Sequence, residues 1–240
     1  MLKINIGWHL KIICSKRSKA TESTVATAYA RDMTGIIALQ GGGAFSLHDE
    51  LDARLLKEVK AKKVVVLPTA DAFERPEVLV SAANAWASRL GVEVEALMVM
   101  RRNEAEDKDA IKIVRKADAV WFVGDNPIHM RSVLKDTPVW EAVQHVLKEG
   151  GLVVGVGASA SAFCDPMIDP RGGALALGLG LLTGMAIVAQ SETVTVDRHA
   201  RAKKLANVPL VFLPSSSALI RRGHDWEEVG PNEKVGQLPT

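Results

Sequence analysis

The chain has 240 residues, of which 48% are hydrophobic, 24% charged and 5% aromatic, and its formal net charge is +2. This composition is that of an ordinary globular protein and excludes intrinsic disorder over most of the length. No segment approaches the roughly 18 consecutive apolar residues of a membrane-spanning helix, so we expect no membrane association. Two cysteines, Cys14 and Cys164, cannot form a disulfide framework, which favours a reducing compartment and a cytoplasmic location.

The first 33 residues differ from the rest of the chain in charge and in pattern. Six basic and two acidic residues lie there, so the remainder is slightly acidic and the net charge indicates no anionic partner. Residues 15–32 are rich in serine, threonine, alanine and lysine without a clear period, which is typical of a flexible segment. We interpret residues 1–33 as a leader outside the fold, with a targeting peptide as the alternative and Met33 as an alternative start.

Predicted strands and helices alternate through the body of the chain. Apolar runs bounded by glycine or proline predict strands, and helical spacing of apolar residues predicts the segments between them. The predicted strands are 35–39, 64–67, 92–99, 119–123 and 152–156, and the predicted helices are 51–59, 76–90, 105–117 and 139–147. This alternation predicts an α/β fold with three layers and a doubly wound, mainly parallel sheet. We expect one domain over residues 34–229 and a loose C-terminal tail over residues 230–240.

Small residues fill three loops that follow predicted strands, at 41–45, 124–127 and 157–162. Functional groups gather at the carboxyl ends of such strands. The third loop reads Gly-Ala-Ser-Ala-Ser-Ala, and a small-residue run between a strand and a helix is typical of a nucleophile elbow. The alternative is a turn that only allows the helix to pack closely, because Ser161 stands where the second glycine of Gly-x-Ser-x-Gly would be.

Six segments in the same order resemble the cyanophycinase and peptidase E family of serine peptidases. They are Gly-Gly-Gly at 41–43, Pro-Thr-Ala at 68–70, Phe-Val-Gly-Asp-Asn-Pro at 122–127, Val-Leu-Lys-Asp-Thr-Pro at 133–138, the loop at 157–162, and Gly-Leu-Gly-Leu-Leu at 178–182. The resemblance extends from about Thr34 to about Arg222. It implies a fold similar to class I glutamine amidotransferases, a serine-type hydrolase acting on aspartyl or cyanophycin-like peptides, and no cofactor. A homodimer is left open.

The resemblance also implies roles for particular residues. Ser159 takes the place of the nucleophile, and a serine here argues against a glutamine amidotransferase, which uses a thiol. Cys164 is interpreted as a buried packing residue. The amides that would form the oxyanion hole are those of Ala160, Gly124 and Asp125, and the residues that would bind substrate are Asn126 and Arg131.

The histidine and the acidic residues of the family are missing from their expected positions. Counting forward from Gly178 puts Gln190 at the histidine position, and counting back from Leu205 puts Thr195 there. His199 is the best replacement base and His129 the next, while Glu192 and Asp197 are candidates for the orienting acid. A serine hydroxyl needs a hydrogen-bonded base to act as a nucleophile. Two hypotheses therefore stay open: a hydrolase that uses Ser159, or a catalytically degenerate relative that binds a ligand or partner in the same cleft.

Other binding functions find little support in the sequence. The three glycines at 41–43 lack the further glycine of a dinucleotide-binding loop, because residue 46 is Ser46. No spacing of cysteine and histidine indicates a zinc site. The basic run from Arg198 to Lys204 is interpreted as an exposed helix face, so we expect no metal and no nucleic acid.

Overall fold

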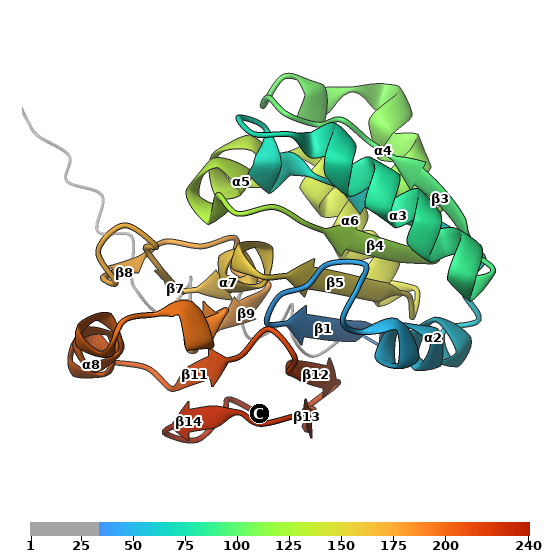
Figure 1. Ribbon diagram of the computed structural model, residues 1–240. Coiled ribbons are helices and arrows are strands. Elements are labelled where there is room, and N and C mark those ends of the chain that lie inside the picture. The colour runs from blue at the N-terminus through green and yellow to red at the C-terminus, as the bar shows by residue number, and fades with distance from the viewer. Residues whose placement is uncertain (1–33) are drawn as a thin grey trace, which may run out of the picture.

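The computed structural model describes residues 34–240, and the interpretation of residues 1–33 as a leader lies outside that part of the chain. A seven-stranded sheet in the order β13-β12-β1-β5-β4-β2-β3 forms its centre (Figure 1). Five strands run parallel, whereas β12 is antiparallel to β1 and β13 is antiparallel to β12. The strands are β1 Ile36–Gln40, β2 Lys63–Leu67, β3 Glu93–Ala96, β4 Ala119–Phe122, β5 Leu152–Val156, β12 Ala218–Arg222 and β13 Asp225–Val229.

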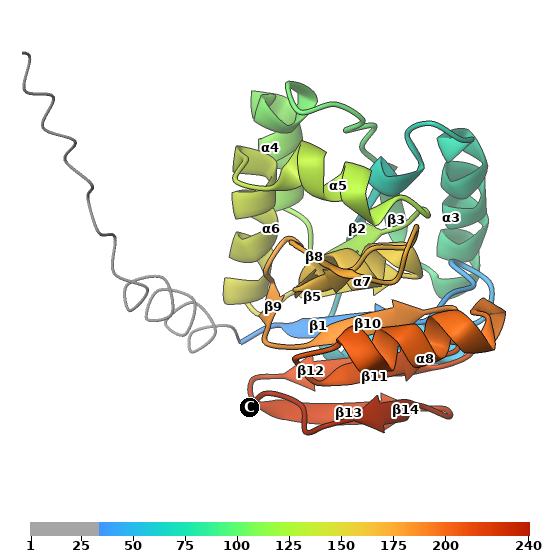
Figure 2. The ribbon, with the colours of Figure 1, turned by 90° about the vertical axis from the view of Figure 1, so that its left-hand side faces the viewer.

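Helices cover both faces of this sheet (Figure 2). Alternate strand residues face opposite sides, so the side chain of Ile37 joins a core with α4–α7, whereas that of Ala38 joins a core with α2 and α3. The three-layer, mainly parallel α/β prediction is therefore confirmed. The helices are α2 Asp49–Glu58, α3 Pro76–Leu90, α4 Lys108–Arg115, α5 Pro127–Leu134, α6 Pro138–Lys148, α7 Ala158–Phe163 and α8 Val196–Leu205. None of the helices within residues 34–240 is long and apolar enough to cross a membrane.

Short strands and turns build the part of the molecule that follows α7. A three-stranded sheet has the order β10-β11-β14, and two pairs of very short strands lie beside it. The strands are β6 Cys164–Asp165, β7 Met167–Ile168, β8 Leu175–Ala176, β9 Leu182–Thr183, β10 Ala186–Ala189, β11 Leu210–Leu213 and β14 Glu233–Val235. Single 3₁₀ turns are η1 Thr69–Asp71, η2 Glu104–Glu106 and η3 Ser191–Thr193.

The C-terminal segment is part of the fold, although the sequence suggests a loose tail over residues 230–240. Strand β14 pairs antiparallel with β11, and the indole of Trp226 donates a 2.8 Å hydrogen bond to the carbonyl of Pro239. The sequence of β14 is mostly polar and so gives no strand pattern, because an exposed edge strand needs no apolar face.

A buried carboxylate lies between α2 and the sheet. Asp52 is 1% exposed and accepts hydrogen bonds from the Gln40 amide at 2.5 Å and from the Trp86 indole at 3.0 Å. Burial raises the pKa of Asp52 to about 7, and the two hydrogen bonds offset only part of that effect. The folded protein therefore binds this proton more tightly than the unfolded chain does.

We predict that Asp52 makes stability depend on pH between about 4 and 7. Well below pH 4 the Asp52 carboxyl is protonated in both states. Between about pH 4 and 7 only the folded state holds the proton, so the free energy of unfolding falls until the folded state also loses the proton near pH 7. Relative to Asp52→Asn, the free energy of unfolding of the wild type should fall by up to about 4 kcal/mol across this range. Urea unfolding at a series of pH values measures it, with the exposed Asp225→Asn as the control; parallel wild-type and Asp52→Asn profiles would contradict the prediction.

Candidate functional site

The carboxyl ends of the parallel strands meet at one edge of the sheet, where the loops after β1, β2, β4 and β5 lie together. The amide of Asn126 donates to the carbonyl of Ala70 at 2.8 Å, and the amide of Gly157 donates to the carbonyl of Gln40 at 2.9 Å. These bonds hold neighbouring loops in fixed positions. The candidate site is therefore built on a rigid frame, as expected for this class of sheet.

The turn between β5 and α7 has Gly157 at its apex. Strand β5 ends at Val156, Gly157 has φ 61° and ψ −130°, and α7 begins at Ala158. A side chain is strained in this backbone conformation, which glycine adopts freely. Ser159, which is expected at the position of the nucleophile, is the second residue of α7 and follows the turn.

The hydroxyl of Ser159 points into the protein. Ser159 is 0% exposed, and its Oγ donates a 3.2 Å hydrogen bond to the carbonyl of Gly124. This bond ties α7 to the loop after β4. The amide of Ala160, expected in an oxyanion hole, already donates to the carbonyl of Gly157 at 3.0 Å. This donor therefore has a partner within the turn, and its role in an oxyanion hole stays a prediction.

Gly157 has an open side that faces Gln190 and Asp125. A Cβ placed on Gly157 would lie 3.7 Å from Gln190 Nε2 and 3.9 Å from Asp125 Oδ1, which are ordinary contact distances. Gln190 follows β10 with a φ of 48°, and its amide donates to the carbonyl of Gly41 at 3.0 Å. Within residues 34–240, neither the side-chain amide of Gln190 nor the carboxylate of Asp125 has a hydrogen-bond or ion-pair partner. Both side chains are therefore free to meet a ligand.

His199 lies elsewhere and has other partners. Its Nε2 is 3.0 Å from a carboxylate oxygen of Glu233, and its ring centroid is 3.8 Å from that of Phe212. Glu233 also pairs with Lys203, so this cluster fastens α8 to β14. The structure does not bring His199 to Ser159. Of the other candidates, His129 Nε2 lies 2.9 Å from the carbonyl of Met100.

The remaining predicted side chains have mainly structural contacts. Glu192 accepts from the amide of Ser215 at 3.0 Å. The Asn126 side chain accepts from the amide of His129 at 2.9 Å and so caps α5. Arg131 Nε donates to the carbonyl of Gly178 at 3.2 Å, which fixes the loop before β9. Asn126 lines a cavity and stays a candidate for binding, whereas Arg131 lines none of the cavities described below.

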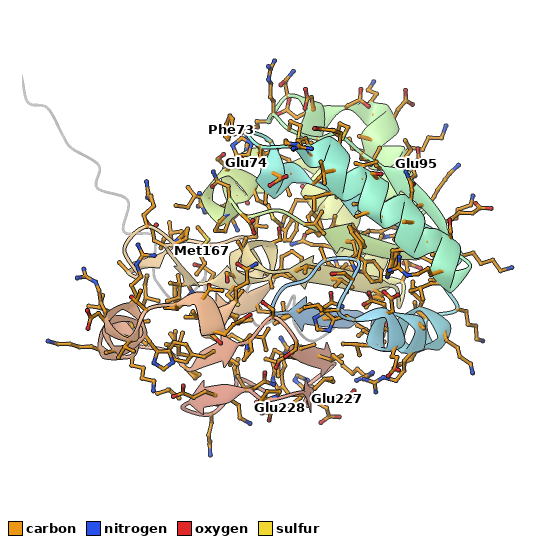
Figure 3. The ribbon with its side chains drawn as sticks, in the orientation of Figure 1. Phe73, Glu74, Glu95, Met167, Glu227 and Glu228 are labelled. Atoms are coloured by element: carbon orange, nitrogen blue, oxygen red, sulfur yellow. The ribbon has the colours of Figure 1, made fainter. Side chains whose placement is uncertain are left out.

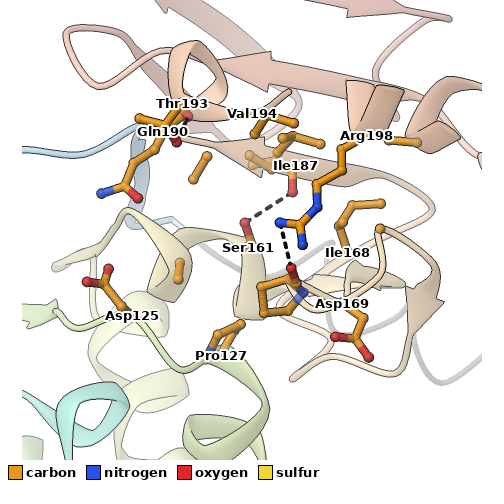
Figure 4. Close-up of a pocket in the computed structure, with 16 residues that line it drawn as sticks. Asp125, Pro127, Ser161, Ile168, Asp169, Ile187, Gln190, Thr193, Val194 and Arg198 are labelled. Carbon is orange, nitrogen blue, oxygen red and sulfur yellow. Dashed lines mark hydrogen bonds between the residues drawn. The ribbon is translucent and has the colours of Figure 1, made fainter. Parts of the chain in front are cut away.

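Three adjoining cavities open at this edge, and Asp125 lines all of them. The acidic cavity, of about 570 Å³, has Asp71, Glu74, Asp125, Gly124, Gly157 and Gln190 in its wall. The α8 cavity, of about 360 Å³, also has Gln190 in its wall (Figure 4). The α5 cavity, of about 530 Å³, includes Phe73 and Asn126. Figure 3 shows Phe73 and Glu74 close together in the segment that leads into α3.

The acidic cavity carries an excess of negative charge. Burial raises the pKa of Asp71 above its ordinary value, and the nearby charge of Asp125 raises it further. The wall also contains the cation Arg75, whose Nε lies 3.7 Å from Oε1 of Glu77 and so is paired outside the group of cavity carboxylates. In the described part of the chain, no cationic side chain pairs with Asp71, Glu74 or Asp125. A positively charged group would be favoured here.

The match to a family model decides the classification. The model of Peptidase family S51 matches residues 34–175, which is more than half of the chain. The chain belongs to Peptidase family S51. This is a family of serine peptidases and confirms the peptidase E resemblance. The matched range ends before Gln190 and α8, so it leaves the segment expected to carry the family's histidine uncovered.

Two solved structures share the fold. A peptidase from an acI-B1 Actinobacterium has a TM-score of 0.76 and 22% sequence identity, covering 85% of this chain and 95% of its own. A protein from Listeria monocytogenes EGD-e described as a peptidase E has a TM-score of 0.62 and 16% sequence identity. The match covers 84% of this chain and 99% of that protein. These likenesses fit the predicted class I glutamine amidotransferase-like fold. A search of curated proteins found no match.

We predict that Ser159→Ala lowers the free energy of unfolding by about 1 kcal/mol, because the Gly124 carbonyl loses a buried donor. Urea unfolding measures the loss. The matched control is Ser132→Ala, whose exposed hydroxyl donates to the carbonyl of His129 and should change stability by less than about 0.5 kcal/mol. An Ser159→Ala protein as stable as the wild type would show that the buried hydroxyl contributes nothing to folding.

Proposed function

We propose that this protein is a non-hydrolysing member of family S51 that binds a peptide-like ligand in the cleft. The observation that carries the proposal is Gly157, which stands alone between strand and helix and faces Gln190. Glycine has no hydroxyl to attack a carbonyl, and a glutamine amide is no base near neutral pH. A nucleophile and its base are thus both lacking where the strand-to-helix turn would present them.

The spacing of small residues supports Gly157 as the counterpart of the nucleophile. In Gly-x-Ser-x-Gly the positions two before and two after the serine must be small. Centred on Gly157, these positions are Gly155 and Ser159. A Cβ on Gly155 would lie 2.8 Å from the Cα of Ala160, so the first small residue is sterically required. The pattern therefore fits with Gly157 at its centre and Ser159 as the second small residue.

The cleft keeps what is needed to bind a peptide. The amides of Gly124 and Asp125 have no acceptor within residues 34–240 and could donate to a ligand carbonyl. Gln190 has both a donor and an acceptor on its side chain. Because Gly157 has no side chain, a ligand can reach the backbone of the turn. Binding without proton transfer needs nothing more than these groups.

Hydrolysis by Ser159 of aspartyl peptides is the second candidate, and membership of a serine peptidase family favours it. This mechanism requires the Ser159 hydroxyl to leave the Gly124 carbonyl and become exposed. It also requires a base, and His199 would have to leave Glu233. Without a base, the rate falls by about 10⁶ in a well-studied serine protease.

We predict that a fluorophosphonate probe does not label the wild-type protein at any pH from 6 to 9. The double variant Gly157→Ser/Gln190→His should gain labelling, by at least about 10²-fold over Gly157→Ser alone, because a base then faces the hydroxyl. The serine at 157 will cost about 1–3 kcal/mol of stability through backbone strain. Labelling is read by gel fluorescence and the modified residue by mass spectrometry.

The controls separate the two candidates. Adding Ser159→Ala to the double variant should leave its labelling unchanged. Peptides incubated with the wild type, an aspartyl dipeptide among them, should be recovered intact by mass spectrometry. Wild-type labelling that disappears in Ser159→Ala would establish an activated serine and overturn the proposal.

A further inference from the structure

Part of the wall of the α8 cavity is apolar. The cavity lies between β10, α8 and the segment around Ile168, and Val188, Val194 and Ala202 line it. Ile168, Val188 and Ala202 belong to the hydrophobic cluster that packs α8 against β10 and β11. A volume of about 360 Å³ lies within the range of small-molecule sites, which are mostly apolar with a few placed polar groups. Such walls favour an aliphatic or aromatic group over a charged one.

A guanidinium without a carboxylate partner borders this cavity (Figure 4). Arg198 donates to the carbonyls of Pro170 at 3.5 Å and Arg171 at 3.4 Å, both long hydrogen bonds. Asp169, which also lines the cavity, is instead paired with Arg171 at 2.7 Å. No carboxylate within residues 34–240 forms an ion pair with Arg198. A ligand carboxylate at this position would gain charge-assisted hydrogen bonds.

The opposite end of the cleft has the complementary charge. Gln190 and Asp125 line both the α8 cavity and the acidic cavity, so the two cavities adjoin at these side chains. Asp71 and Glu74 add carboxylates on the far side, where an ammonium group is favoured. A peptide that passes Gln190 would place its amino end near these carboxylates and its last residue at α8. The side-chain amide of Gln190 would then face the peptide group between the amino end and the last residue.

We propose that the α8 cavity binds the apolar side chain of the C-terminal residue of a short peptide, and that Arg198 binds the carboxylate of that residue. The proposal rests on the peptide-binding function proposed above and specifies its ligand. It differs from the aspartyl preference implied by the family resemblance. The apolar part of the wall favours an apolar side chain over a charged one, and Arg198 is assigned to the peptide's own carboxylate.

Calorimetric titration of the full chain at pH 7 tests this with Ala-Leu, Ala-Asp, Ala-Lys and Ala-leucinamide. Ala-Leu should bind at least about tenfold more tightly than Ala-Asp or Ala-Lys, because only leucine gains from apolar burial. Ala-leucinamide should bind about tenfold more weakly than Ala-Leu. Arg198→Gln should remove most of the difference in affinity between Ala-Leu and Ala-leucinamide.

A matched pair of valines locates the side-chain site. Val194→Trp should fill the cavity and weaken the binding of Ala-Leu at least about tenfold, whereas Val196→Trp should leave its binding unchanged, because Val196 is 84% exposed and lies outside the cavity.

Two outcomes would overturn this inference without overturning the proposed peptide binding: Ala-Asp or Ala-Lys binding as tightly as Ala-Leu, or Val194→Trp binding Ala-Leu as tightly as the wild type. Failure of every peptide to bind the wild type would overturn both proposals. If Val194→Trp does not fold, an Arg198→Gln protein that still discriminates the amide overturns the inference.

Discussion

The close approach of α7 to β5 is the constraint on which the site depends. Gly155 is the fourth of five residues in a fully buried strand, and the backbone of α7 at Ala160 occupies the space that a side chain there would need. Because the helix lies so near the strand, the chain reverses direction at a single residue, Gly157. The same packing buries Ser159 and directs its hydroxyl to the loop after β4. That loop carries Asp125, so the packing of one short helix positions the turn, the carboxylate and the cleft between them.

A glycine at the apex changes the energetics of this arrangement. A side chain in the backbone conformation of Gly157 costs about 1–3 kcal/mol, and such strain is typical of functional sites where the side chain has a task. Here the strain is absent and the backbone is open to a ligand. The carboxylates beside Gly157 also favour a bound ligand, provided that it carries a positive charge. Asp71 is buried beside Asp125, so a bound cation would offset both the burial and the repulsion that raise the pKa of Asp71.

The parallel half of the fold could be predicted because its strands are continuous apolar runs. Strand β5 matches its predicted bounds, β1 is shifted by one residue, and β2 and β4 differ by one residue at one end. Strand β3, predicted over residues 92–99, is shorter and spans Glu93–Ala96. The region after α7 could not be predicted in this way. Its strands are short, β13 reads Asp-Trp-Glu-Glu-Val, and β14 finds its partner in β11 through non-local pairing. Period-2 patterns carry little signal in such strands.

The sequence points to the loop after β5, but it does not fix which residue of that loop stands at the strand-to-helix turn. Gly-Val-Gly-Ala-Ser and Gly-Ala-Ser-Ala-Ser overlap in one small-residue run, and only the backbone angles at Gly157 separate them. Counting along the chain gave Gln190 and Thr195 as counterparts of the family's histidine. The structure places Gln190 opposite the turn, whereas Thr195 caps α8. Distances across the sheet edge carry this information, and no local pattern does.

In the function proposed above, Gly157 and Gln190 have their full effect only together. A histidine facing an apex without a hydroxyl could still act as a general base toward water, and a serine without a base would retain the help of nearby amides. With glycine and glutamine in these two places, neither route has its proton acceptor or its nucleophile. Glutamine nevertheless keeps hydrogen-bonding capacity at the centre of the cleft, between the acidic cavity and the α8 cavity. In the function proposed above, the pair lacks the groups for proton transfer, while Gln190 can still form hydrogen bonds to a peptide.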